Sequence, residues 1–230
     1  MRILLAALIV GLGALFGATA QAADIPEYPD IEIPEVDYGL EGGFYLRGSA
    51  AANLLWTQEH VSTACGCILP PTAPGYGYSV GAGFGYETGT GLRVDGTIDY
   101  LSNDGLTDGT NTLHMRGGVA LANVYYDLPI SGHGAEGGIG AYIGAGAGAT
   151  FYQVSVTPVD PTLPDGQGWT PTVAAMAGVT YDAGNWVADL GYRLLYLPKI
   201  SNYNAVAPGP YYLYDNTVHE VRGTVRYRFN

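Results

Sequence analysis

The sequence predicts an all-β fold: a single eight-stranded antiparallel transmembrane β-barrel with up-and-down (meander) strand order. Two observations carry this prediction: eight segments alternate apolar and polar residues with a period of two, and short turns alternate with longer connections. Successive side chains of a strand point to opposite faces, so each segment has one apolar and one polar face. After residue 22 no stretch reaches the roughly 18 apolar residues of a spanning helix. A membrane-embedded chain would therefore have to close as a barrel.

The N-terminal part of the chain differs in composition from the rest. Residues 1–22 combine an apolar run with an Ala-Gln-Ala site at their end, which is typical of a cleaved export signal. A membrane anchor is the alternative, but the run is short and rich in glycine. Residues 23–41 hold seven acids, three prolines and no base, which predicts an extended, acidic periplasmic tail. We expect the barrel domain to occupy residues 42–230.

The strands are predicted from their alternation, in chain order. The last segment is the clearest, because Val221, Val225 and Tyr227 share one face and charged residues occupy the other. The sixth is the least regular, since Pro171 lies near its start, where proline is tolerated only at an end or edge. The predicted strands are 44–56, 76–87, 92–101, 111–126, 138–152, 169–181, 185–196 and 217–230.

Each strand is expected to turn its apolar face to lipid. In the first four strands, these faces are the even positions from Phe44 to Trp56, the even positions from Tyr78 to Tyr86, then Leu92, Val94, Ile98 and Tyr100, then Leu113, Met115, Val119 and Leu121. In the last four, they are the odd positions from Ile139 to Phe151, the odd positions from Val173 to Tyr181, the even positions from Trp186 to Tyr196, and the odd positions from Val221 to Phe229. The inward glycines of the fifth strand predict close internal packing, not a phosphate loop.

The connections predict an orientation. Residues 88–91 and 182–184 form tight turns, and 127–136 is somewhat longer. The remaining connections, 57–75, 102–110, 153–168 and 197–216, are mostly long. Short turns at one rim and long loops at the other are typical of outer-membrane barrels. We expect both termini on the periplasmic side and the long loops outside the cell.

Aromatic residues gather at the strand ends. Such rings favour the headgroup level of a bilayer, so two aromatic girdles are expected. The girdle residues are predicted to be Phe44, Trp56, Tyr86, Tyr100, Trp169, Trp186, Tyr196, Tyr227 and Phe229.

Charge placement favours the barrel over a soluble sandwich. Seven of the nine lysines and arginines lie on predicted strands, all in the phase opposite to the lipid face. The predicted luminal charge network consists of Arg47, Arg93, Asp95, Asp99, Arg116, Asp189, Arg193, Glu220 and Arg222. Eight strands leave an interior that side chains just fill. Buried charges must pair, so we expect a closed plug, with a narrow ion path as the alternative.

The two ends of the predicted barrel resemble a known family. Residues 181–193, 219–229 and 43–48 are similar to the closing hairpin and first strand of small Gram-negative outer-membrane barrels, above all RopB-type surface antigens and porin-like proteins of alpha-proteobacteria, distant relatives of the OmpA membrane domain. The resemblance implies assembly by the barrel-assembly machinery. Such proteins usually end in Phe, whereas here Phe229 is penultimate and Asn230 is last. No peptidoglycan-binding domain is expected to follow.

Catalytic and metal chemistry have little support. Cys65 and Cys67 lie in an expected loop, and export favours a disulfide between them or with another chain over a metal site. The four histidines are scattered, and no Ser completes a triad with His219 and Glu220, which face opposite sides of one strand. We expect no enzyme activity and no cofactor; a lipid A-modifying enzyme is the least favoured class.

Together these patterns predict an outer-membrane protein with a structural and surface-display role. A narrow porin for ions or very small solutes is the alternative. The expected partners are outer-membrane lipids and lipopolysaccharide. The net charge of −12 argues against nucleic acid as a partner.

Overall fold

The computed structural model describes residues 42–62, 67–68, 71–107, 112–131, 138–157, 165–202 and 211–229. The predicted export signal and acidic tail lie outside these residues. The strands are β1 (Gly43–Ser62), β2 (Cys67–Ile68), β3 (Gly75–Glu87), β4 (Leu92–Thr107), β5 (Thr112–Ser131), β6 (Gly138–Thr157), β7 (Gly166–Ala183), β8 (Trp186–Ser201) and β9 (Tyr211–Phe229).

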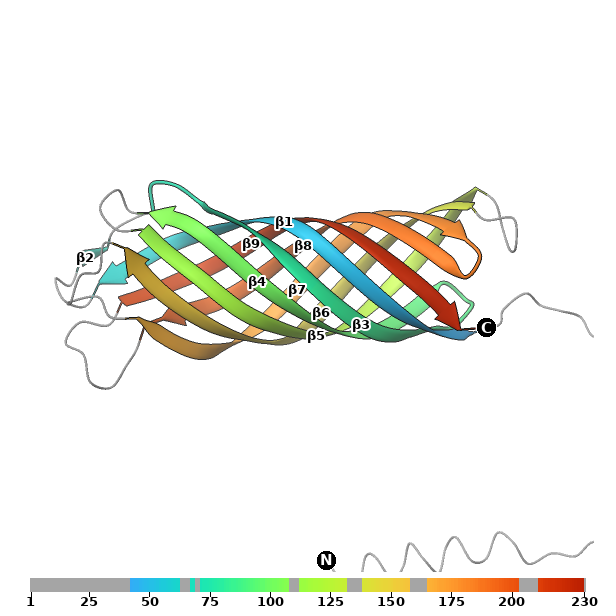
Figure 1. Cartoon of the computed structure of the whole chain (residues 1–230), viewed down its shortest axis with the longest axis horizontal. Coiled ribbons are helices and arrows are strands. Elements are labelled where there is room, and N and C mark those ends of the chain that lie inside the picture. Colours follow the sequence, from blue (N-terminus) through green and yellow to red (C-terminus); the bar gives the residue numbers. More distant parts are fainter. Residues whose placement is uncertain are drawn as a thin grey trace, which may run out of the picture. The chain divides into compact units, whose positions relative to one another are not determined.

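Eight long strands form a closed ring. Each pairs antiparallel with its neighbours along the chain, and β1 also pairs with β9, so the blue and red strands lie side by side in Figure 1. The short strand β2 pairs only with the end of β1. The predicted eight-stranded, up-and-down antiparallel barrel is therefore confirmed. Within the described residues there is no helix of the length and apolarity needed to cross a membrane.

Tight turns join the strands at one end, which we call the turn end; we call the opposite end the loop end. Gly89 and Gly91 between β3 and β4, and Gly184 between β7 and β8, have φ of 76°, 88° and 80°. Glycine adopts these left-handed angles without strain, which explains the tight reversals there. At the loop end β4, β8 and β9 run beyond their predicted limits, to Thr107, to Ser201 and from Tyr211.

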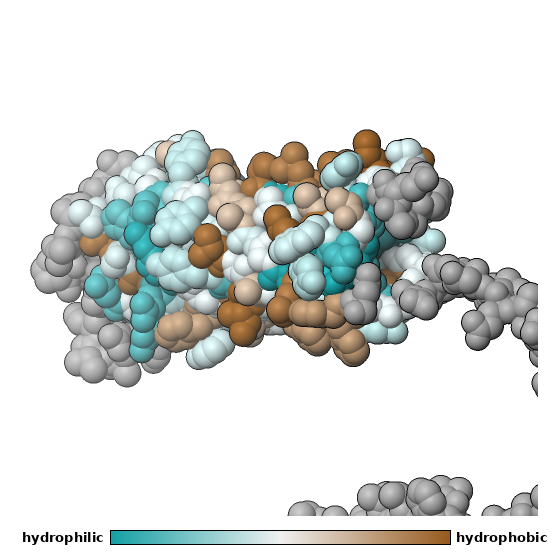
Figure 2. Space-filling model, turned by 45° about the vertical axis from the view of Figure 1, so that its right-hand side comes forward, coloured by the Kyte–Doolittle hydropathy of each residue, from teal (hydrophilic) through white to brown (hydrophobic). Residues whose placement is uncertain are grey.

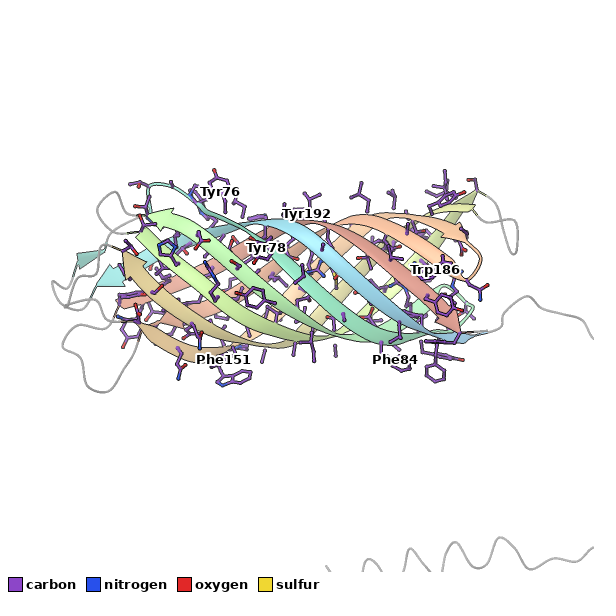
Figure 3. The ribbon with its side chains drawn as sticks, viewed as in Figure 1. Tyr76, Tyr78, Phe84, Phe151, Trp186 and Tyr192 are labelled. Atoms are coloured by element: carbon purple, nitrogen blue, oxygen red, sulfur yellow. The ribbon has the colours of Figure 1, made fainter. Side chains whose placement is uncertain are left out.

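The outer surface is apolar along most of its length. Outward residues of the central part include Ile98, Leu190 and Val221, each at least 60% exposed. Figure 2 shows hydrophobic side chains over the middle of one face and hydrophilic ones towards its left-hand side. In Figure 3, Phe84 and Trp186 lie near the turn end, whereas Tyr76 and Phe151 lie towards the loop end. The barrel thus exposes the type of surface that normally forms the core of a soluble protein.

The interior is divided into two halves of different chemistry. Towards the turn end and the middle it holds paired arginines and carboxylates. Towards the loop end it holds an apolar core, in which Leu55, Leu197 and Leu213 are almost fully buried. The alternation predicts a polar inner face throughout; the apolar half of the interior is a finding of the structure.

Candidate functional site in the barrel interior

Four charged side chains form a cluster across the middle of the barrel. Arg193 Nε lies 2.6 Å from Glu220 Oε2, and Arg193 Nη1 lies 2.7 Å from Asp99 Oδ2. Arg222 contacts the same two acids, with Nη1 2.7 Å from Asp99 Oδ1 and Nη2 3.0 Å from Glu220 Oε2. Ser79 donates a hydrogen bond of 2.9 Å to Glu220 Oε1. We call Asp99, Arg193, Glu220 and Arg222 the central cluster.

The central cluster balances its charges and links distant strands. Its two arginines and two acids come from β4, β8 and β9, and all four side chains are buried. Burying a charge costs its hydration free energy, and this cost must be offset by interactions with its partners. Short, charge-assisted hydrogen bonds offset it best. Each acid accepts from both arginines. Removing one arginine would therefore take one partner away from both acids.

A second group of charges lies nearer the turn end, around Arg226. Its Nε and Nη2 each lie 3.0 Å from one oxygen of Asp189, and its Nη1 contacts Glu87. Arg228 bridges Glu87 at 2.7 Å and Asp182 at 2.6 Å, where both partners are partly exposed. These contacts tie the closing strand β9 to β3, β7 and β8.

A third group combines arginines with tyrosines. Asp95 accepts from Tyr45 Oη at 2.8 Å and from Arg47 Nη1 at 2.8 Å. The guanidinium of Arg93 lies 4.0 Å from the ring centroid of Tyr125 and binds Asp127 through two hydrogen bonds of 2.9 Å. Flat guanidinium groups stack on aromatic rings, so the tyrosines fill the space between charges.

Several members of these groups were missed by sequence reasoning. Glu87 and Asp182 stand at the ends of β3 and β7, and Asp127 lies within β5, just beyond the predicted end of that strand. The inward phase of Arg226 and Arg228 is visible in the alternation of β9, but their partners are not. The alternation places Tyr45 and Tyr142 on the inner phase of their strands, whereas Tyr125 was missed together with the phase of β5.

Arg116 is not part of the interior, and the predicted phase of its strand is wrong. Along β5 the buried residues are Leu113, Met115, Val119 and Leu121, which form part of the apolar interior. Arg116 is on the opposite, outward phase, and its Nη1 lies 2.8 Å from Asp104 Oδ1 near the loop end. Both phases of β5 are apolar over most of its length, so alternation alone could not choose between them.

Inward tyrosines pack against glycines of the facing strands. A Cβ on Gly178 would stand 2.7 Å from Tyr142 Cε1 and from the backbone of Gly191. A Cβ on Gly168 would stand 2.6 Å from the hydroxyl of Tyr152. The glycines thus provide room for rings that cross the interior. Beside the central cluster a cavity of about 10 Å³ is lined by Arg47, Arg93, Arg193 and Arg222 among others, which is room for about one water.

The predicted girdle residues all face outward. At the turn end the rings of Phe44 and Tyr86 stand 5.0 Å apart, and those of Trp186 and Tyr227 stand 4.8 Å apart. Towards the loop end Trp169 packs against Phe151 at 5.2 Å. Eight of the nine are at least 36% exposed, namely Phe44, Trp56, Tyr86, Tyr100, Trp169, Trp186, Tyr227 and Phe229. Tyr196 is half-buried and donates a hydrogen bond to Asp215.

Other predicted features lie partly beyond the described chain. Cys65 is outside the described residues, and of Cys67 only the backbone, in β2, is described. In the described ranges no three His, Cys, Asp or Glu side chains are grouped so as to hold a metal ion. His219 lies on the outward phase of β9, where its Nδ1 is 2.5 Å from Tyr192 Oη. Among the described residues, the hydrogen bonds of His219 go to Tyr192 and Thr217, not to a carboxylate or a serine as a catalytic triad would need.

No family model and no curated protein matches the chain. Among solved structures, the crystal structure of Neisserial surface protein A is similar at a TM-score of 0.53 and 19% identity, covering 82% of this chain and 99% of that one. The outer membrane protein OprG from Pseudomonas aeruginosa gives a TM-score of 0.46 at 14% identity, covering 83% and 99%. Ail from Yersinia pestis gives 0.39 at 15% identity, covering 81% and 99%. The likeness to the Neisserial protein shows the fold of this chain, which is that of a small eight-stranded outer-membrane-type barrel.

Proposed function

We propose that this chain is a non-catalytic outer-membrane protein that serves as a structural element and surface-display platform, with a lumen closed by charged side chains. The central cluster carries the proposal. Asp99, Arg193, Glu220 and Arg222 join across the barrel from three strands with contacts of 2.6 to 3.0 Å. Charges held this closely by each other are poor ligands for a passing ion, because each carboxylate of the cluster already accepts from both arginines.

The outer surface supports a location in the outer membrane. Outward apolar residues lie between two sets of aromatic rings, as expected of a barrel that contacts lipid tails in its middle and headgroups at its rims. On this proposal the turn end is periplasmic and the loop end is extracellular. Lipids including lipopolysaccharide would cover the wall, and the barrel-assembly machinery would insert it. Membership of the RopB-type surface antigens is the finer form of the same proposal.

Membrane location is tested by fractionation and gel mobility. The mature protein is expected in the outer-membrane fraction, and it is expected to run faster on a gel unheated than boiled, because closed barrels resist detergent. Recovery in the soluble periplasmic fraction, with the same mobility before and after boiling, would contradict the proposal.

The closed lumen is tested by conductance in planar bilayers. The refolded wild-type protein is expected to give no steady single-channel current in potassium chloride. A double variant, Arg193→Ala with Arg222→Ala, removes both cations of the central cluster and is expected to introduce current. Arg116→Ala is the matched control, since this arginine lies on the outside. A steady current through the purified, folded wild type that is lost when the protein is boiled before reconstitution would favour the narrow porin instead.

A further inference from the structure

The ladder of residue pairs between β7 and β8 ends before either strand does. Their last residue pair towards the loop end is Val173–Tyr196, although β7 continues to Gly166 and β8 continues to Ser201. Along the same stretch β7 still pairs with β6, as far as Val154–Gly166, and β8 still pairs with β9, as far as Ser201–Tyr212. Both strands therefore keep their outer ladder partners along this stretch but are not paired with each other. We call this stretch, residues 166–172 facing 197–201, the seam.

The edges of the seam are capped by side chains. Pro171 and Pro198 stand on opposite edges, and proline has no N–H to offer a ladder. The backbone N–H of Ser201 donates to Tyr152 Oη at 3.1 Å, and Asn216 Nδ2 donates to the carbonyl of Leu197 at 3.1 Å. Unsatisfied backbone groups facing lipid are strongly unfavourable, because no water is there to hydrogen-bond them. The N–H of Ser201 and the carbonyl of Leu197 therefore have side-chain partners in place of a facing strand.

Tyr152 crosses the seam from inside. It belongs to β6, passes beneath β7 at Gly168, where a side chain would meet its hydroxyl, and reaches the backbone of Ser201 on β8. Beyond it the edges approach again, since a Cβ on Gly166 would collide with the backbone of Asn202. The seam is thus a bounded stretch without ladder pairing, with Val173–Tyr196 at one end, Gly166–Asn202 at the other and Tyr152 across it, and Leu197 and Ile200 behind it are fully buried.

A groove of about 500 Å³ lies over the seam and takes its lining from both edges, with Trp169 and Pro171 from β7 and Pro198 and Lys199 from β8. Tyr152 of β6 and Tyr212 of β9 complete the lining. This volume is in the range of small-molecule sites. Lys199 is the only lysine of the chain, and its Nζ lies 4.1 Å from the ring centroid of Tyr212. Inside the wall, Leu197 and Ile200 belong to the apolar half of the interior.

We propose that the seam is a lateral window which admits one acyl chain of an anionic bilayer lipid, with the lipid phosphate held by Lys199. This proposal rests on the membrane location proposed above. The occupant follows from chemistry: prolines and aromatic rings line the mouth, an apolar core lies behind it, and one cation stands at the rim. The chain carries a net charge of −12, so an anionic headgroup is repelled by much of the protein and attracted where Lys199 lies.

The window is tested by photocrosslinking in vesicles. The refolded barrel is placed in phosphatidylcholine vesicles containing phosphatidylglycerol with a diazirine near its acyl terminus, and adducts are mapped by mass spectrometry. Adducts are expected on the inward residues Leu197 and Ile200. Tyr152→Phe, which removes only the hydroxyl bound to Ser201, is expected to raise these inward adducts several-fold. Tyr142→Phe is the matched control on the same strand, and it is expected to leave them unchanged.

The headgroup assignment is tested with Lys199. Lys199→Ala is expected to reduce inward adducts to the level given by a diazirine phosphatidylcholine, whereas Lys199→Arg retains them. Adducts confined to outward residues such as Trp169 in every variant would mean ordinary lipid contact and would overturn the window. Adducts on outward Leu190 report membrane insertion separately, so their absence would instead count against the proposed membrane location.

Discussion

Arg226 and Asp189 meet side-on inside the barrel, with Nε and Nη2 each 3.0 Å from one carboxylate oxygen. Asp189 stands opposite Thr224 in the ladder between β8 and β9, so this ion pair is diagonal, two residues along β9 from the directly facing position. The planar fork of a guanidinium fits a carboxylate in this geometry and adds direction as well as charge. The pair therefore fixes how the closing strand sits against its neighbour.

Asp189→Asn is expected to lower the free energy of unfolding by about 3 kcal/mol, because it leaves a buried guanidinium with less negative charge around it. Urea titration of the refolded barrel in detergent, followed by tryptophan fluorescence, measures the change. Asp182→Asn is the control: its carboxylate is 31% exposed and pairs with the partly exposed Arg228, and pairs of this kind contribute about 0–1 kcal/mol. Equal losses in the two variants would contradict the importance of burial here.

An inward and an outward arginine should lose different amounts of stability when each is replaced by leucine. Arg193→Leu removes a partner from both Asp99 and Glu220 in the interior, and a loss of about 3–5 kcal/mol is expected. Arg116→Leu removes a partly exposed ion pair with Asp104 and hydrogen bonds to the carbonyls of Asn103 and Met115, and a loss of about 1 kcal/mol or less is expected. Thermal loss of the fast-migrating gel band compares them directly. A larger loss of stability for Arg116→Leu than for Arg193→Leu would contradict the outward position of Arg116.

The glycines on the two faces of the wall should differ in their tolerance of a methyl group. Gly178→Ala places a Cβ 2.7 Å from Tyr142 and 2.6 Å from the carbonyl of Leu190, and overpacking of this kind costs about 1–3 kcal/mol. Gly118→Ala faces outward with nothing within 4 Å, and it is expected to be neutral or to stabilise by about 0.4–1 kcal/mol. Unfolding midpoints in urea give both values. An unchanged unfolding midpoint for Gly178→Ala would mean that the Tyr142 ring can adopt another rotamer without loss of stability.

The end of the closing strand gives a test of assembly. Phe229 faces outward and its ring lies 5.4 Å from that of Tyr227 in an edge-to-face arrangement. Phe229→Ala is expected to reduce the amount of protein in the outer membrane, because the strand loses its terminal aromatic anchor. Deletion of Asn230 is expected to leave that amount unchanged or improved. Normal assembly of Phe229→Ala, together with failure of the deletion, would mean that Asn230 carries the assembly signal.

The sequence was sufficient for the fold and for the phase of most strands. In β9, charged residues alternate with apolar ones except at Gly223 and Thr224, and a slip by one residue would expose Glu220, Arg222 and Arg226 to the apolar side. The structure has these three buried and Val221 and Val225 exposed. Likewise, the glycines of 88–91 and 182–184 mark turns, because left-handed backbone angles are strained for other residues.

What only the tertiary structure decided depends on contacts between residues far apart in the chain. The phase of β5 follows from the apolar half of the interior, which strands from the whole ring build together. The partners of Arg193 and Arg222 are selected by strand stagger, which places Asp99 of β4 opposite two residues of β8 and β9. The end of the ladder at Val173–Tyr196 has the same origin: Pro171 is a local irregularity in the sequence, and only closure of the barrel brings it to the edge that faces Pro198 across the seam.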